Sequence, residues 1–233
     1  MYNLPQKLVA EFIGTFTLIF IGVGSICADQ YLTAAGKPGA GLLGIAVAHG
    51  LAFGIMVTAM GHISGGHFNP AVTIGFWVTR RIGTFHAIFY WIAQLLGASA
   101  GAYLIKFVIS DSIWGPVALG TPALAPDFTL AHGMLLEGVM TFFLVFVFFA
   151  TAVDAKGAFN RIAGFAVGLA ITIGMLFGYP FTGAAMNPAR AFGPALAAPH
   201  WANQSVYWLG PLLGGVLAGF IYDRVFLRDQ PPA

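Results

Sequence analysis

Charged residues are scarce in this sequence of 233 residues. Only 8% of them are Asp, Glu, Lys or Arg, against about a quarter in an ordinary soluble domain. A surface with so little charge cannot face water, so most of it must lie in lipid. The net charge of +2 is also too small to indicate a nucleic-acid partner.

Cysteine is nearly absent as well, because Cys27 is the only one in the sequence. A single cysteine excludes an internal disulfide and leaves the redox compartment open. The sequence has no Walker-type phosphate loop and no Cys/His spacing typical of a metal site, so we expect neither a cofactor nor a metal. Apolar residues make up 58% of the chain, and the 31 glycines suit close contact between membrane helices.

Six apolar stretches of about 20 residues are each long enough to cross ~30 Å of hydrocarbon. They fall near residues 8–28, 41–61, 84–108, 131–153, 161–179 and 204–226. Lys7 and the run after it superficially fit a signal peptide, but Glu11 interrupts that run, which is long enough to span. Alternating strands of a barrel are absent, so the backbone must form helices. The sequence therefore predicts an all-α membrane protein with one domain, residues 1–233.

The cations are divided unevenly between the two sides of six alternating helices. One side carries Lys7, Arg80, Arg81, Lys156, Arg161, Arg224 and Arg228. The other side carries Lys37 and Lys106. The positive-inside rule then predicts that both termini are cytoplasmic. The short tails, with residues 227–233 as a loose end, favour a cell (plasma or inner) membrane.

The chain resembles itself in two halves, residues 8–108 and 131–226. Three patterns recur in the same order at similar spacing: Glu11-x-x-x-Thr15-x-x-Leu18 with Glu137-x-x-x-Thr141-x-x-Leu144, Phe68-Asn69-Pro70-Ala71 with Met186-Asn187-Pro188-Ala189, and the segment 90–97 with 207–214. Each half holds three spans, an odd number. The second half should therefore cross the membrane upside down, as an inverted repeat.

Two shorter apolar segments, near 69–78 and 188–197, cannot span and begin with Asn-Pro-Ala. Asn is a good helix N-cap and Pro is favoured at the first helical position. Asn69 and Asn187 therefore predict two re-entrant half-helices that meet near the midplane. Each tip carries about half a positive charge, so the facing tips repel cations. Because the cap uses the Asn oxygen, we expect its NH2 group to be free to donate into a lumen.

Small residues precede each tip, and irregular backbone at this depth must line a water-filled cavity or be buried in protein. We expect a ladder of acceptor carbonyls from Gly65, Gly66, His67, Gly183 and Ala185. Ser64 and His67 do not indicate a hydrolase, since the sequence places no acid to orient the histidine. We therefore expect no catalytic residues.

Glu11 and Glu137 are carboxylates inside predicted spans, where charge is costly and usually functional. One role is a proton relay, as in a transporter. The other is a structural acceptor for loop N–H groups left unpaired by the re-entrant turns. The occurrence of one such acid in each half favours the structural role.

The segments His67-Phe68-Asn69-Pro70-Ala71-Val72 and Met186-Asn187-Pro188-Ala189-Arg190 resemble the two signature loops of the aquaporin (major intrinsic protein) family. The resemblance covers nearly the whole chain. It implies a right-handed six-helix bundle in the lipid bilayer, a pore for water in each protomer, and a homotetramer. The resemblance also implies that the opposed tips and their donors break the proton relay along the file of water molecules.

The resemblance also places a selectivity filter at His49, Met175, Ala184 and Arg190. Arg190 matches the family, as a fixed cation that repels protons and metal ions. The other three depart from strict water channels and look like the plant vacuolar-membrane (tonoplast) branch. That likeness implies ammonia, hydrogen peroxide or urea besides water. Met175 is flexible and Ala184 is small, which predicts a wider, less polar filter.

Two alternatives to a water channel remain open at this point. A glycerol facilitator of the same family would resemble its relatives in having Asp after the loop arginine, where this chain has Ala191, and in lacking the pair Tyr207-Trp208. A secondary transporter could couple protons through Glu11 and Glu137. The paired Asn-Pro caps favour a fixed pore over a rocking gate.

Overall fold

The computed structural model describes residues 2–156 and 162–227. Two of the predicted cytoplasmic cations, Arg161 and Arg228, lie outside this part, as does all but the first residue of the predicted tail. The described part contains six apolar helices long enough to cross a membrane: Leu4–Ala34, Gly41–Ser64, Thr84–Val108, Leu130–Val153, Ala163–Thr182 and Gln204–Val225. The predicted all-α membrane fold is confirmed.

The first span is longer than predicted and is built from three pieces. They are α1 (Leu4–Thr17), a π-helical segment η1 (Leu18–Val23) and α2 (Gly24–Ala34). The predicted start near residue 8 is wrong, because Asn3 and Gln6 form a capping box one turn earlier. The fourth span has the same construction, with α7 (Leu130–Phe148) followed by a π-helical η3 (Phe149–Val153).

The two short segments form half-helices α4 (Pro70–Val78) and α9 (Pro188–Ala197). The side chain of Asn69 accepts a hydrogen bond from the backbone N–H of Ala71. The side chain of Asn187 accepts from the N–H groups of Ala189 and Arg190. The predicted asparagine caps are confirmed, and each half-helix begins at the proline that follows.

Glycines allow the long helices to touch backbone to backbone. The remaining four are α3 (Gly41–Ser64), α5 (Thr84–Val108), α8 (Ala163–Thr182) and α10 (Gln204–Val225). The close contact that the many glycines suggested is seen on α5 and α10: a Cβ on Gly101 would lie 2.9 Å from the carbonyl oxygen of Phe16 on α1, and one on Gly219 would lie 2.8 Å from that of Gly75 on α4. Any side chain there would push the helices apart.

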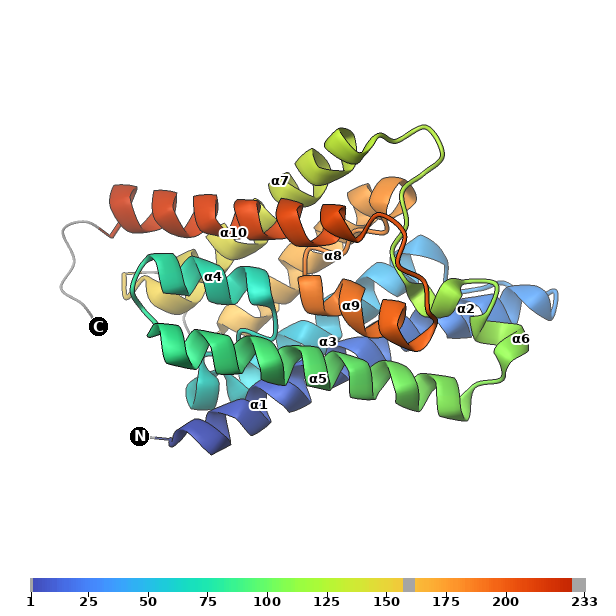
Figure 1. Cartoon of the computed structure of the whole chain (residues 1–233), viewed down its shortest axis with the longest axis horizontal. Coiled ribbons are helices and arrows are strands. Elements are labelled where there is room, and N and C mark those ends of the chain that lie inside the picture. Colours follow the sequence, from blue (N-terminus) through green and yellow to red (C-terminus); the bar gives the residue numbers. More distant parts are fainter. Residues whose placement is uncertain (1, 157–161, 228–233) are drawn as a thin grey trace.

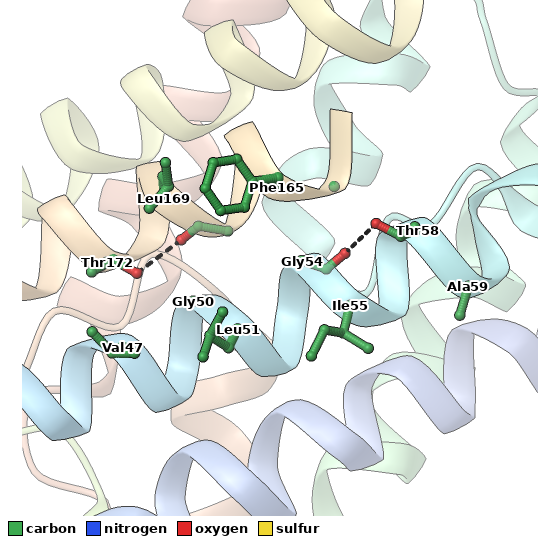
Figure 2. Close-up of a pocket in the computed structure, with 12 residues that line it drawn as sticks. Val47, Gly50, Leu51, Gly54, Ile55, Thr58, Ala59, Phe165, Leu169 and Thr172 are labelled. Atoms are coloured by element: carbon green, nitrogen blue, oxygen red, sulfur yellow. Dashed lines mark hydrogen bonds between the residues drawn. The ribbon is translucent and has the colours of Figure 1, made fainter. Parts of the chain in front are cut away.

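A third glycine crossing, between α3 and α8, was not predicted. A Cβ on Gly54 would lie 2.5 Å from the carbonyl oxygen of Gly164. Figure 2 shows the apolar groove that flanks this crossing, with Val47 and Leu51 on α3 and Phe165 on α8. The groove shares no lining residue with the small cavity described below, so it belongs to the outer face of the helix pair.

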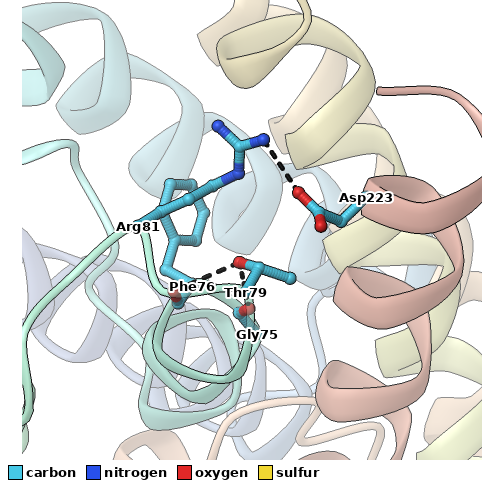
Figure 3. Close-up of polar contacts among 5 residues, drawn as sticks. All are labelled: Gly75, Phe76, Thr79, Arg81 and Asp223. Atoms are coloured by element: carbon cyan, nitrogen blue, oxygen red, sulfur yellow. Dashed lines mark hydrogen bonds and ion pairs between the residues drawn. The ribbon is translucent and has the colours of Figure 1, made fainter. Parts of the chain in front are cut away.

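The ends of the half-helices are fastened to the bundle on opposite sides. Beyond α4, Arg81 forms an ion pair of 2.9 Å with Asp223 near the end of α10 (Figure 3). Beyond α9, the ammonium of Lys106 donates to the carbonyl of Ala197 at 2.9 Å and lies 4.8 Å from the ring centre of Trp114. Helix α1 begins and α10 ends at the same end of the bundle (Figure 1), as an even number of crossings requires.

The connection between the halves contains structure that the sequence did not indicate. A short helix α6 (Asp111–Trp114) is followed by a 3-10 turn η2 (Ala118–Gly120). All three residues of this turn have left-handed backbone, with φ 44° at Ala118, 51° at Leu119 and 65° at Gly120. The turn matters because Gly120 contacts Arg190 in α9, as described next.

Candidate functional site

The two half-helix tips hold each other through their asparagines. The side-chain nitrogen of Asn69 donates to the carbonyl of Met186 at 2.9 Å, and that of Asn187 donates to the carbonyl of Phe68 at 2.9 Å. The prediction that each NH2 group is wholly free is therefore wrong, since one N–H of each is used across the interface. One N–H per asparagine remains for another acceptor.

The crossed bonds depend on unusual backbone just before each cap. Phe68 has φ 46° and Met186 has φ 50°, in the left-handed region that costs non-glycine residues energy. These conformations accompany the turn of each carbonyl toward the opposite tip. Gly65 and Gly183, at φ 95° and 77°, begin the two turns without a side-chain penalty.

Glu11 is fully buried and serves as a four-fold acceptor for the first loop. Its carboxylate accepts from the Ser64 hydroxyl at 2.6 Å and from the Gln94 amide at 2.8 Å. It also accepts from the backbone N–H groups of His67 at 3.0 Å and Phe68 at 2.7 Å. Without it, these N–H groups would be unpaired in a place that lipid surrounds.

Glu137 does the same for the second loop with three donors. They are the Thr182 hydroxyl at 2.7 Å and the backbone N–H groups of Ala185 at 2.9 Å and Met186 at 2.7 Å. The acceptor geometry matches the structural role weighed for both acids. Sequence reasoning missed Thr182 and Gln94 as partners. The two hydroxyl partners could have been predicted from their spacing, because Ser64 and Thr182 each lie five residues before a capping asparagine.

The four residues assigned to the filter line one small cavity. His49 comes from α3, Met175 from α8, and Ala184 and Arg190 from the second loop and α9. The rest of its lining is Leu18, Asn69, Leu144, Ile171, Ala185, Met186 and Asn187. The space open to the centre of a water molecule is about 10 Å³, which is room for about one water.

Two residues that line the cavity, His49 and Arg190, carry polar atoms without a partner among the described residues. The Nδ1 atom of His49 lies 2.9 Å from the carbonyl oxygen of Ile45. A carbonyl can only accept, so Nδ1 carries the proton and Nε2 of the neutral ring is left as an acceptor. That Nε2 atom has no partner in residues 2–156 and 162–227.

Arg190 is positioned by the connection between the halves. Its Nη1 atom donates to the carbonyl of Gly120 at 2.8 Å, a partner that sequence reasoning missed and for which no local signal exists. Its Nε and Nη2 atoms are buried without a partner among the described residues. Two residues of the cavity lining thus carry unpaired polar atoms: two donor nitrogens on the Arg190 cation and one acceptor on the neutral imidazole of His49.

A wider hollow lies on the side of the first loop. It offers about 330 Å³ to water centres and includes Gly65, His62, Phe76 and Phe148 in its lining. Of the carbonyl residues predicted to form a ladder, Gly65 lines this hollow and Ala185 lines the small cavity. Gly66, His67 and Gly183 line neither of the two, so their part in a ladder stays a prediction.

The imidazole of His67 is used inside the protein. Its Nδ1 atom lies 3.1 Å from the hydroxyl of Thr73, and its ring packs against Phe76 with centroids 4.3 Å apart. The side chain of His67 therefore supports the first loop.

The chain matches the family model described as major intrinsic protein over residues 2–222. It is 45% identical over 227 residues to Aquaporin TIP2-1 of Arabidopsis thaliana, covering 97% of this chain and 89% of that one. It is also 45% identical over 228 residues to Aquaporin TIP4-4 of Zea mays, covering 96% and 88%. The aquaglyceroporin of Plasmodium falciparum shares the fold, with a TM-score of 0.81 and 24% identity over 97% of this chain and 98% of that one.

Proposed function

The chain belongs to the major intrinsic protein family, and we propose that it conducts water and small neutral solutes, foremost ammonia and hydrogen peroxide, while excluding protons and ions. Membership of this family makes it a multi-pass, passive membrane channel and not an enzyme. The observation that carries the proposal is the cavity for about one water where His49, Met175, Ala184 and Arg190 meet.

Exclusion of cations follows from fixed positive charge along the path. Arg190 is 2% exposed and stands in the cavity, and the tips of α4 and α9 each add a partial positive charge. A cation entering this file would lose its water shell against like charge in a low dielectric. The remaining N–H groups of Asn69 and Asn187 can each donate to the oxygen of a passing water.

Passage of ammonia and peroxide is supported by the acceptor on His49. A water molecule satisfies the cavity by accepting from Arg190 and donating to Nε2 of His49. Ammonia can do both, because its lone pair accepts and its N–H groups donate, and peroxide can do both through its two hydroxyls. The other two filter residues, Met175 and Ala184, offer a thioether and a methyl group. Glycerol is disfavoured by Ala191, which follows Arg190 in place of an aspartate.

The deciding experiment is stopped-flow permeability of reconstituted protein to water, ammonia, peroxide and glycerol. We expect the His49→Phe variant to keep water flux and to lose ammonia flux by about tenfold, the effect of about 1.4 kcal/mol on a barrier. The His86→Phe variant, changed on α5 away from the cavity, should behave as the native protein. Water flux without ammonia or peroxide flux in the native protein would contradict the solute range.

A high activation energy of water flux would instead favour the transporter alternative. In that case the proton-coupled role of Glu11 and Glu137 would return. A channel should show the low activation energy of a preformed path.

We further propose that the two halves form an inverted repeat and that four copies assemble, each with its own pore, in the cell membrane with both termini cytoplasmic. Two matching sets of hydrogen bonds support the repeat. Asn69 and Asn187 each donate to a carbonyl of the opposite loop, and Glu11 and Glu137 each accept from two backbone N–H groups of their own loop. Light scattering of the protein in detergent should give the mass of four chains. Protease accessibility of tags at both ends should report the same side.

A further inference from the structure

Two methionines line the small cavity, Met175 and Met186, and each is 1% exposed. The sulfur of Met186 packs against α8, since a Cβ on Gly174 would lie 2.5 Å from it. Another methionine packs against the same helix but is not among the residues that line the cavity: a Cβ on Gly178 would lie 2.7 Å from the Cε atom of Met140. Met140 is also buried, at 5% exposure. Met175 and Met140 therefore differ mainly in whether they border the path of the solute.

We propose that Met175 is a modification site at which hydrogen peroxide in the filter forms methionine sulfoxide, and that the sulfoxide closes the pore. The sulfur lone pair attacks one peroxide oxygen, the O–O bond breaks and an S–O bond forms. The second oxygen leaves as hydroxide and takes the proton of the first, so that water is the product. The thioether is oxidised by two electrons and peroxide is reduced by two.

Closure follows from the size of the cavity. With about 10 Å³ open to water centres, there is room for about one water. A sulfoxide oxygen added to Met175 would occupy much of that room. Because the side chain has three rotatable bonds, the new oxygen can turn toward the open space without a shift of α8.

Arg190 supplies the partner that would hold the sulfoxide in place. Arg190 lines the same cavity, and its Nε and Nη2 atoms have no acceptor within the described part of the chain. A sulfoxide oxygen is a strong acceptor, and a hydrogen bond from a guanidinium is charge-assisted. The native thioether accepts hydrogen bonds only weakly. Oxidation would therefore create a hydrogen bond from Arg190 to the side chain of Met175 within the filter.

This inference rests on the proposed function in one respect, that peroxide reaches the filter. The test is to expose proteoliposomes to hydrogen peroxide for increasing times, stop the reaction with catalase, and measure both water flux and the oxygen gained by each methionine-containing peptide. We expect Met175 to gain oxygen before Met140. Water flux should fall with the oxidised fraction of Met175, by about tenfold at completion, or about 1.4 kcal/mol on the barrier.

Three variants sharpen the result. Met175→Leu should keep its flux through the same treatment, whereas Met140→Leu should lose it as the native protein does. Met175→Gln, which puts a polar acceptor at this position permanently, should have low flux before any peroxide is added. Oxidation of Met175 no faster than Met140, unchanged flux with Met175 oxidised, or equal loss in Met175→Leu would each overturn the inference.

Failure of the proposed solute range can be told apart from failure of this inference. Peroxide uptake by fresh vesicles, measured before oxidation builds up, reports conduction by itself. The peptide masses report modification by itself. Slow uptake together with rapid oxidation of Met175 would reject peroxide conduction and retain the modification site.

Discussion

The two re-entrant loops have nearly the same backbone but use their polar groups differently. In the first loop, Glu11 has four donors, and the hydroxyl of Tyr90 donates to the carbonyl of Ser64 at 2.7 Å. In the second loop, Glu137 has three donors. There the hydroxyl of Tyr207, which matches Tyr90 in the repeat, has no partner among the described residues.

The same contrast holds beside the asparagine caps. His67 and Thr73 bond to each other in the first half, where the second half has Ala185 and Ala191. The residue three positions after the capping asparagine is Val72 in the first half and Arg190 in the second. The first loop thus satisfies its polar groups internally, whereas the second leaves polar atoms for the permeating molecule. We propose that the first loop mainly supports the pore and that the second loop selects the solute.

The largest expected effect comes from replacing the buried acid of either loop, Glu11 or Glu137. Both loops should lose stability, although they differ in how they use their other polar groups. Each carboxylate oxygen of Glu11 and of Glu137 faces at least one backbone N–H group. In Glu11→Gln or Glu137→Gln, the amide NH2 must then oppose one of these N–H groups. An unpaired buried donor costs about 1–3 kcal/mol, so both variants should unfold at clearly lower temperature, measured by thermal stability in detergent.

Asp127→Asn, at an exposed position of the connection between the halves, is the control and should leave the unfolding temperature unchanged. If one glutamate variant were as stable as the native protein and its flux lost a dependence on pH, that acid would be a relay and the structural assignment would fail.

The second prediction makes the second half resemble the first at one position. Arg190→Val installs the residue that the first half has at the matching position. The fold should persist, because the side chain makes its recorded hydrogen bond to Gly120 alone in the described structure. Proton conductance should rise by about tenfold or more, since about 1.4 kcal/mol less barrier suffices for that, while water flux is kept.

The matched control is Arg80→Val, which removes an exposed arginine beyond α4. It should leave proton conductance in voltage-clamped vesicles at the native level. An equal rise of proton conductance in both variants would show that the net charge of the protein, and not the cation in the filter, excludes protons.

The smallest expected effect is a difference in stability between phenylalanine variants of the two matching tyrosines, Tyr90 and Tyr207. Tyr90→Phe removes a hydrogen bond and should cost about 0.5–1.5 kcal/mol. Tyr207→Phe removes a buried hydroxyl that has no recorded partner, so its cost should be near zero or negative. Thermal unfolding of the two variants, with the exposed Tyr103→Phe as baseline, measures the difference. Equal costs would show that the hydroxyl of Tyr207 is satisfied after all, for example by water.

Much of the fold could be predicted because lipid restricts the backbone to structures that satisfy their own hydrogen bonds. Long apolar runs in hydrocarbon must be helices, and Asn-Pro fixes where each half-helix begins. The filter residues were assigned through the resemblance to a family, and their role stays a prediction. The π-helical segments after Thr17 and Phe148 could not be predicted, since nothing in their composition separates one helical hydrogen-bond pattern from another.

The sequence by itself determined the membrane spans, the caps at Asn69 and Asn187, and the presence of one buried acid in each half, because each rests on local chemistry or on spacing along the chain. Only the tertiary structure decided that each asparagine gives an N–H to the opposite loop, that Gly120 holds Arg190, and that His49 presents an acceptor to the filter. These contacts join residues far apart in the chain, and a donor finds its partner only after the helices have packed.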